Sequence, residues 1–263
     1  MPTPRENPRP DRALTVPLLV LAALCGLALR GAGPTYGQFV PPAAGEAFTE
    51  DFEHGDPLPD RWIGDRSRFT TALRNGSRWL RPRAEPDRSE TNVRADTLAL
   101  ARSSRADPGR WELRVAHAEN WTSDRTLRWY LTATRPHLRD ALRGYYVQLG
   151  GNNLDRIALY RQDGRRERRA LVGAGEHGRT SGETGTYVLR ADRDEDGRWA
   201  IYLNGALEIS AVDSTYRGSR FTGFWIGHRR GGPPALFLDD LRVAGPIDET
   251  APLVRTARYD TAS

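Results

Sequence analysis

The sequence predicts an all-β fold in which two antiparallel sheets form a sandwich. Three observations support this prediction: short segments alternate apolar and polar residues, turn residues separate them at nearly regular intervals, and no long amphipathic helix interrupts them. The pattern is clearest in the hairpin of 144–150 and 156–161, where Val147 and Leu149 alternate with Tyr146 before a Gly-Gly-Asn-Asn turn. Alternating strand and helix units are missing, so a doubly wound parallel sheet is not expected.

The first expected strand covers 48–53 and ends at His54-Gly55-Asp56-Pro57. The others are expected near 78–82, 90–101, 110–119, 126–134, 144–150, 156–161, 186–193, 198–204, 206–211, 221–227 and 235–243. Turn residues separate them at Asn75-Gly76, Asp107-Pro108-Gly109, Asp163-Gly164, Asp196-Gly197, Asn204-Gly205 and Gly231-Gly232-Pro233-Pro234. The stretch 136–142 is compatible with one short turn of helix.

The N-terminal residues 1–37 have the pattern of a secretory signal peptide. Three arginines precede a mostly apolar run at 13–29, and small residues follow, with cleavage expected near Gly37. The run is marginal in length for a membrane anchor, which is the competing interpretation, and Leu24 before Cys25 disfavours a lipoprotein site. We therefore expect a secreted or bacterial cell-surface protein with no stable membrane span after cleavage. The mature chain would contain no cysteine, so disulfides are excluded.

The rest of the chain divides into three parts. Residues 38–47 are expected to be a linker, 48–245 a β-sandwich domain, and 246–263 either a linker or terminus, or the start of a further module. Every one of the 39 Lys+Arg residues is arginine, and the formal net charge is +5. The cluster Arg165-Arg166-Glu167-Arg168-Arg169 holds no aromatic residue to stack on a base, so it is better explained as a solvated hairpin tip. We expect no nucleic-acid partner.

Several segments together resemble a known family. The quoted hairpin and two further pieces are similar to the N-terminal β-sandwich of secreted multidomain surface proteins of Bacteroidetes-type bacteria; the matching segments are 144–151, 156–164, 188–193, 197–202 and 236–243. The resemblance covers roughly residues 48–245 and implies a concanavalin A-like (laminin-G/lectin-type) jelly roll. It also implies immunoglobulin-like and lamin-tail modules downstream as partners within the same protein. That family has no firmly assigned activity, so sugar binding follows from fold analogy alone.

The sequence gives little support for catalysis. Lectin-fold glycosidases hold two carboxylates close together on one strand, as in Glu-x-Asp-x-x-Glu, whereas the acidic cluster at 192–197 has the pattern of a turn. No Gly-x-Ser-x-Gly or His-Glu-x-x-His motif occurs, and the five histidines are scattered singly. We therefore expect no strand with a catalytic carboxylate pair and no enzyme, with a glycoside hydrolase as the less favoured alternative.

A metal site is a more plausible hypothesis. The first and last strands of jelly rolls commonly pair, which would bring Asp51 and Glu53 near Asp239 and Asp240. Converging carboxylates repel one another unless they are solvated or bridged by a cation, and hard oxygen ligands suit Ca²⁺. The sequence therefore predicts a structural calcium ion at these four residues; ordinary solvent-facing acidic residues are the alternative.

Strand parity defines a candidate ligand face. On four strands, apolar residues take one parity and polar or tyrosine residues the other; the candidates are Arg128, Tyr130, Tyr146, Gln148, Tyr160, Gln162, Tyr202 and Asn204. Aromatic rings stack on sugars, and amides and guanidinium groups hydrogen-bond to hydroxyls, so this face would suit a glycan or cell-surface polymer if the strands share one sheet. The alternative is a purely structural spacer module, because Tyr is a good strand former on exposed sheet faces. The tryptophans expected in the core are Trp62, Trp79, Trp111, Trp199 and Trp225.

Overall fold

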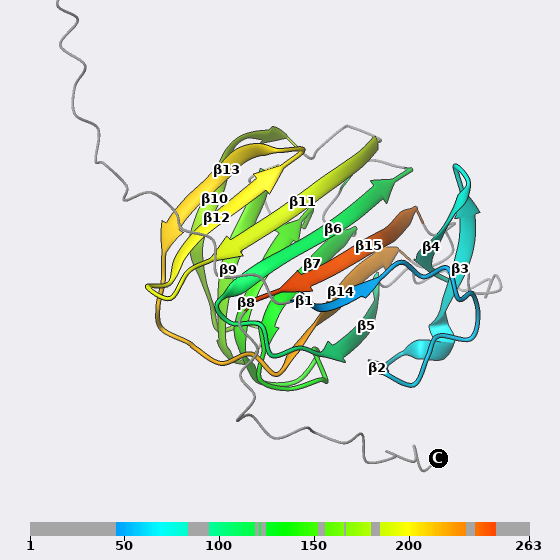
Figure 1. Cartoon of the computed structure of the whole chain (residues 1–263), viewed down its shortest axis with the longest axis horizontal. Coiled ribbons are helices and arrows are strands. Elements are labelled where there is room, and N and C mark those ends of the chain that lie inside the picture. The colour runs from blue at the N-terminus through cyan, green and yellow to red at the C-terminus, as the bar shows by residue number, and fades with distance from the viewer. Residues whose placement is uncertain are drawn as a thin grey trace, which may run out of the picture. The chain divides into compact units, whose positions relative to one another are not determined.

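The described part of the chain consists entirely of strands, turns and loops, apart from one short 3-10 turn. The computed structural model describes residues 46–83, 95–118, 121, 125–151, 156–165, 167–179, 185–229 and 235–245. Two antiparallel sheets stack as a sandwich (Figure 1), and the 3-10 turn is η1 (Arg66–Arg68). The predicted all-β, two-sheet architecture is therefore confirmed. Within these ranges no helix has the length and apolar character needed to cross a membrane.

We call the first sheet the eight-stranded sheet; β6 and β15 lie side by side in its middle (Figure 1). Its order is β13 (Ala206–Val212), β12 (Arg198–Leu203), β11 (Gly185–Arg193), β6 (Gly109–His117), β15 (Leu236–Ala244), β4 (Ser77–Pro82) and β3 (Phe69–Arg74). β1 (Glu46–Glu50) also pairs with β15, in a register that sets Glu50 opposite Leu241. The predicted pairing of the first and last strands is confirmed.

The second sheet, the seven-stranded sheet, contains the hairpin that the sequence shows most clearly. Its order is β10 (Arg169–Arg179), β9 (Arg156–Gly164), β8 (Leu142–Leu149), β7 (Thr126–Ala133), β14 (Phe221–Arg229), β5 (Ala95–Ser103) and β2 (Trp62–Gly64). Three strands were not predicted: β2 has only three residues, β3 carries no clear alternation, and β10 contains several glycines, which weaken a strand pattern.

Predicted turns join several strands. The Asn75-Gly76 turn joins β3 to β4 and the Asn204-Gly205 turn joins β12 to β13, with positive φ at all four residues (51°, 85°, 50° and 86°), as a tight two-residue hairpin requires. The described residues of the arginine-rich cluster form the turn between β9 and β10, as expected. Residues 134–141 form bends and a turn and contain no helix. The predicted signal peptide, the tail and most of the linker lie outside the described residues, and the last two linker residues belong to β1.

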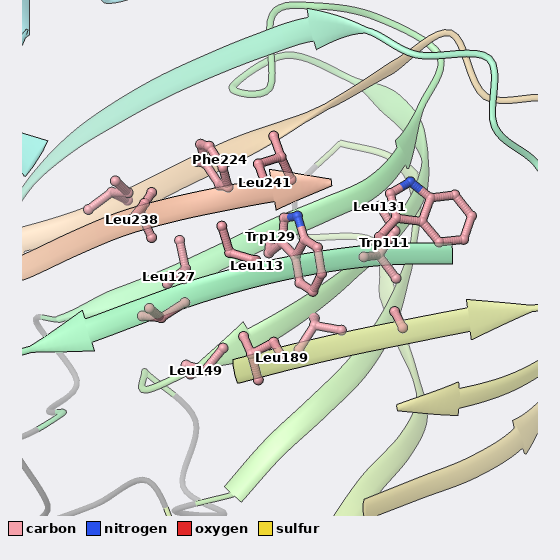
Figure 2. Packing of buried hydrophobic residues seen from close by; sticks show 14 of the residues in the cluster. Trp111, Leu113, Leu127, Trp129, Leu131, Leu149, Leu189, Phe224, Leu238 and Leu241 are labelled. Carbon is pink, nitrogen blue, oxygen red and sulfur yellow. The ribbon is translucent and has the colours of Figure 1, made fainter. Parts of the chain in front are cut away.

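The core lies between the two sheets. Figure 2 shows Trp111 and Trp129 packed with leucines from both sheets, among them Leu113, Leu127 and Leu189. Trp62, Trp111 and Trp199 belong to this core, as predicted. Trp79 and Trp225 are buried but lie outside it: Trp79 packs under the Arg74 and Arg114 guanidinium groups, and Trp225 belongs to a second cluster.

Candidate functional site

The face of the seven-stranded sheet that points away from the core carries this second cluster, and we call it the outer face. On β8, Tyr145 and Val147 point into the core, so Tyr146 points outwards. The register sets Tyr146 between Tyr130 of β7 and Tyr160 of β9. The ring centroids are 5.0 Å apart for Tyr130–Tyr146 and 5.4 Å apart for Tyr146–Tyr160. Three tyrosines therefore form one row across three strands.

Arg128 lies beside this row. Its guanidinium group is 4.5 Å from the centroid of the Trp225 ring and 5.3 Å from that of Tyr146, so it packs between two aromatic faces. Arg128 Nε donates a hydrogen bond to Gln148 Oε1 at 3.2 Å. Arg169 Nη1 donates to the same oxygen at 3.3 Å, and its guanidinium group lies 5.0 Å from the Tyr160 ring centroid. Two cations and four aromatic rings thus share one side of the sheet.

The two glutamines of the face have a common supporting geometry. Gln148 Nε2 donates to the carbonyl oxygen of Gly150 at 2.9 Å, and Gln162 Nε2 donates to that of Gly164 at 3.0 Å. Gln162 Oε1 accepts a hydrogen bond from the Tyr130 hydroxyl at 2.7 Å. Both glutamines are fully buried. Their oxygens accept hydrogen bonds from Arg128, Arg169 and Tyr130, so they hold these three side chains in position.

Most of the outer face is covered. Tyr130 and Tyr146 are fully buried, whereas Tyr160 and Arg128 are each 8% exposed and Trp225 is 6% exposed. Part of the cover comes from the 134–141 loop, because Leu138 packs into the same cluster. Arg139 of that loop donates to Asp65 Oδ2 at 2.6 Å and to the Thr97 carbonyl oxygen. Burial raises the pKa of the Tyr160 hydroxyl above its ordinary value.

The structure therefore brings together six of the eight predicted ligand residues: Arg128, Tyr130, Tyr146, Gln148, Tyr160 and Gln162. Tyr202 lies on β12 of the eight-stranded sheet, 3.8 Å from the Arg190 guanidinium group measured to its ring centroid. Asn204 lies in the turn after β12 and accepts a hydrogen bond from the Val188 amide at 2.8 Å. Tyr202 and Asn204 therefore lie apart from the other six candidates. The sequence grouped all eight by residue parity, and parity does not determine which sheet a strand joins.

Sequence reasoning missed Trp225 and Arg169 as members of this face. A signal for Trp225 was present, because Gly223 and Gly227 flank it at the same parity while Phe224 and Ile226 point into the core. A Cβ on Gly227 would lie 3.2 Å from the Trp225 ring, so the glycine leaves room for the indole. Arg169 gave no such signal, because it belongs to the arginine-rich cluster at the start of β10.

The four predicted metal ligands find protein partners. Asp51 Oδ1 accepts a hydrogen bond from the Glu53 amide, and Glu53 Oε1 accepts one from the Arg78 amide at 2.7 Å. Asp239 and Asp240 both contact the Arg114 guanidinium group, at 3.4 and 2.9 Å. Across the described residues, no three His, Cys, Asp or Glu side chains gather closely enough to hold a metal ion. Structural calcium at these residues stays a prediction.

Asp239 is expected to make stability depend on pH. Burial raises the pKa of Asp239 to about 6. The Asp240 carboxylate raises it further, whereas the Asp240 amide, Arg114 and Ser77 lower it. The folded pKa lies above the unfolded value of about 4, so Asp239 lowers stability as pH rises from about 4 through 6. Asp239→Asn should therefore melt at a higher temperature than wild type near pH 7.5 and at a similar temperature near pH 4. An equal loss at both pH values would show that the Ser77 hydrogen bond matters more than the charge.

Comparison with known proteins defines the fold class. Neither models of protein families nor curated proteins match this sequence. Among solved structures, SCLam, a non-specific endo-β-1,3(4)-glucanase from family GH16, is 12% identical with a TM-score of 0.51, over 78% of this chain and 93% of its own. The laminarinase catalytic domain from Thermotoga maritima MSB8 is 11% identical with a TM-score of 0.50, over 78% and 99%. The Emp47p carbohydrate recognition domain is 10% identical with a TM-score of 0.50, over 76% and 95%. The chain has the fold of concanavalin A-like jelly rolls.

The expectation that the chain is not an enzyme is contradicted by these comparisons. Two of the three structures are a glucanase and a laminarinase catalytic domain, so the absence of familiar motifs did not justify the exclusion. The physical reason is that one fold hosts both binding modules and hydrolases, and the chemistry depends on side chains placed on it. At 11 and 12% identity the likeness shows the fold and assigns no activity.

The sequence contains the spacing Glu-x-Asp-x-x-Glu once, although no strand with a catalytic carboxylate pair was expected. Residues 85–90 read Glu-Pro-Asp-Arg-Ser-Glu, which matches Glu-x-Asp-x-x-Glu. Pro86 within it is unfavourable for a central strand, because proline cannot donate to the strand ladder. These residues lie outside the described ranges. The spacing itself therefore occurs in the sequence, and the expectation of no strand with a catalytic carboxylate pair stays a prediction.

Proposed function

We propose that this protein binds a glycan or cell-surface polymer through the outer face of the seven-stranded sheet. The observation that carries the proposal is the row of Tyr130, Tyr146 and Tyr160 beside the Arg128–Trp225 pair. Aromatic rings offer stacking surfaces for sugar rings, and the guanidinium group offers hydrogen-bond donors for their oxygens. The likeness in fold to the Emp47p carbohydrate recognition domain supports the same class of ligand by analogy.

We propose further that the protein is secreted or held at a bacterial cell surface, within a multidomain protein of the kind its sequence resembles. The charged, apolar and small-residue order of residues 1–37 supports secretion. The segments within 144–243 support the family, and the Asp/Thr/Pro-rich stretch after 245 supports a connection to further modules. Immunoglobulin-like or lamin-tail modules would then lie downstream.

A second candidate function is that of a purely structural spacer. The complete burial of Tyr130 and Tyr146, with Leu138 packed into their cluster, favours it. On that reading the tyrosine row stabilises the sheet and contacts no ligand. The two candidates differ in one measurable property, because a spacer is inert towards glycans.

Substitution of Tyr160 tests the proposal against a matched control on the other sheet. Tyr160→Ala is expected to weaken polysaccharide binding by about fivefold to tenfold, because it removes a stacking ring at the solvent edge of the row. Tyr202→Ala removes the same side chain from β12 and is expected to leave binding unchanged. Affinity electrophoresis in gels containing a panel of neutral and acidic polysaccharides measures both. Lack of retardation of the wild-type protein by the whole panel would favour the spacer.

A further inference from the structure

Arg128 and Arg193 are two buried arginines with similar surroundings. Arg128 lies on the outer face of the seven-stranded sheet, and Arg193 packs against residues of the core. Arg193 is 1% exposed, and its guanidinium group packs 4.8 Å from the Tyr145 ring centroid and 4.9 Å from that of Trp199. Arg128 is 8% exposed and packs in the same way between Tyr146 and Trp225. Each arginine therefore lies between a tyrosine of β8 and a tryptophan.

The two arginines differ in their counter-charge. Arg193 Nη1 lies 2.5 Å from Asp107 Oδ1, and its other nitrogen Nη2 donates to the Tyr216 carbonyl oxygen. Arg128 donates from Nε to an uncharged amide, and its buried Nη1 has no hydrogen-bond partner among the described residues. Within the described residues, neither Arg128 nor Arg169 forms an ion pair with a carboxylate. A buried cation is stabilised when an anion reaches it, so Arg128 is a candidate contact for a negatively charged ligand.

Two further groups indicate where that partner would lie. The Tyr146 hydroxyl is buried and has no hydrogen-bond partner in the part of the chain that the structure describes, although its ring contacts Arg128. Arg169 converges with Arg128 on Gln148 Oε1, which brings two like charges close together. An anion beside Arg128 would accept from Nη1 and from the Tyr146 hydroxyl, and would reduce the repulsion between the guanidinium groups. Arg169 is exposed, so the positive charge extends to solvent.

We infer that the ligand of the outer face is an acidic polysaccharide, whose carboxylate or sulfate group pairs with Arg128. This inference rests on the proposed function and names the class of glycan. The anion takes the place at Arg128 that Asp107 takes at Arg193, while neighbouring sugar rings contact Tyr160 and Trp225. Carboxylate and sulfate both supply two or more oxygens for a guanidinium fork, so they share the chemistry that Arg128 requires.

Polymers with one backbone and different charge test the inference. The full chain is titrated by calorimetry with dextran, carboxymethyl-dextran and dextran sulfate, and then with laminarin and its carboxymethylated and sulfated forms. We expect at least one acidic form to bind at least about tenfold tighter than its neutral parent, because the pairing group is desolvated. The preferred form distinguishes a carboxylate from a sulfate as the natural group.

Three variants connect this preference to the site. Arg128→Gln is expected to abolish the preference for acidic over neutral polymers. Tyr146→Phe, which removes only the hydroxyl, is expected to weaken the binding of acidic polymers by about threefold to tenfold. Arg143→Gln removes the same charge from β8, where the Arg143 side chain is 66% exposed, and should change affinity by less than about twofold. Arg128→Gln also removes the packing on Tyr146 and Trp225 and the hydrogen bond to Gln148, so its melting temperature is measured first. If this variant does not fold, Tyr146→Phe carries the test.

Each other result has a definite meaning. Equal binding of neutral and acidic forms would overturn the acidic-ligand inference and leave the proposed function standing. Equal losses in Arg128→Gln and Arg143→Gln would show general attraction to a basic protein and would also overturn it. Absence of binding to all polymers in this set and in the electrophoresis panel would reject the proposed function itself.

Discussion

Arg193→Gln is expected to lower the free energy of unfolding by about 3–5 kcal/mol, because it leaves a buried carboxylate without its counter-charge. Arg193 Nη1 contacts Asp107 Oδ1 at 2.5 Å, and both side chains are almost completely buried. Nη2 also donates to the carbonyl oxygens of Tyr216 and Asp213, so the variant removes bonds to the backbone of the 213–216 segment as well.

The loss should depend on pH in a defined direction. Burial raises the pKa of Asp107, and the Arg193 guanidinium opposes that increase. Without Arg193 the folded pKa of Asp107 rises further above its unfolded value, so the folded state binds a proton that the unfolded state releases. Stability of the variant therefore falls as pH rises through and above the unfolded pKa of about 4, and its defect is smaller near pH 5 than near pH 7.5.

Denaturant unfolding at these two pH values measures both effects. The matched control is Arg198→Gln, because Arg198 pairs with Asp194 and Asp196 on the surface with its side chain 45% exposed. That change should cost less than about 1 kcal/mol. Similar losses in the two variants would mean that the Arg193–Asp107 pair contributes no more than a surface pair.

Local patterns in the sequence predicted the strands well but not their neighbours. Alternation identified β8 and β9 and assigned Tyr146 and Tyr160 to the side opposite Val147, because side-chain direction follows from local geometry. Sheet membership depends on long-range pairing, which parity does not encode. For that reason Tyr202 was grouped with tyrosines that lie on the other sheet.

Burial of the site was equally hidden from the sequence. Tyr130 and Tyr146 were predicted as candidates for a ligand face, and neighbouring rings and Leu138 cover them. The covering loop follows β7 directly, but its path over the sheet is fixed by contacts such as Arg139 with Asp65, which lies far away in sequence. The packing of Arg128 between Tyr146 and Trp225 is likewise visible only once β7, β8 and β14 are assembled.

Glu50 connects the two sheets by several ionic contacts. It lies in β1 of the eight-stranded sheet, is 2% exposed, and accepts a hydrogen bond from Trp62 Nε1 of β2 at 3.2 Å. Arg102 Nη1 of β5 and Arg61 Nε each donate to the same carboxylate at 3.0 Å. Both β2 and β5 belong to the seven-stranded sheet, so one carboxylate links the sheets at this edge.

Glu50→Gln is expected to lower the free energy of unfolding by about 3 kcal/mol, because it keeps the shape of the side chain and removes the anion from two guanidinium groups. Burial lowers the pKa of Arg102 to about 10, and Glu50 opposes this decrease; the variant therefore leaves a desolvated cation with no counter-charge. Glu53→Gln is the matched control, since exposed Glu53 accepts one backbone hydrogen bond from Arg78, and it should cost less than about 1 kcal/mol. Urea unfolding of both variants decides the matter: if Glu50→Gln costs no more than Glu53→Gln, β1 is held to the seven-stranded sheet by apolar packing, and the ionic contact contributes little.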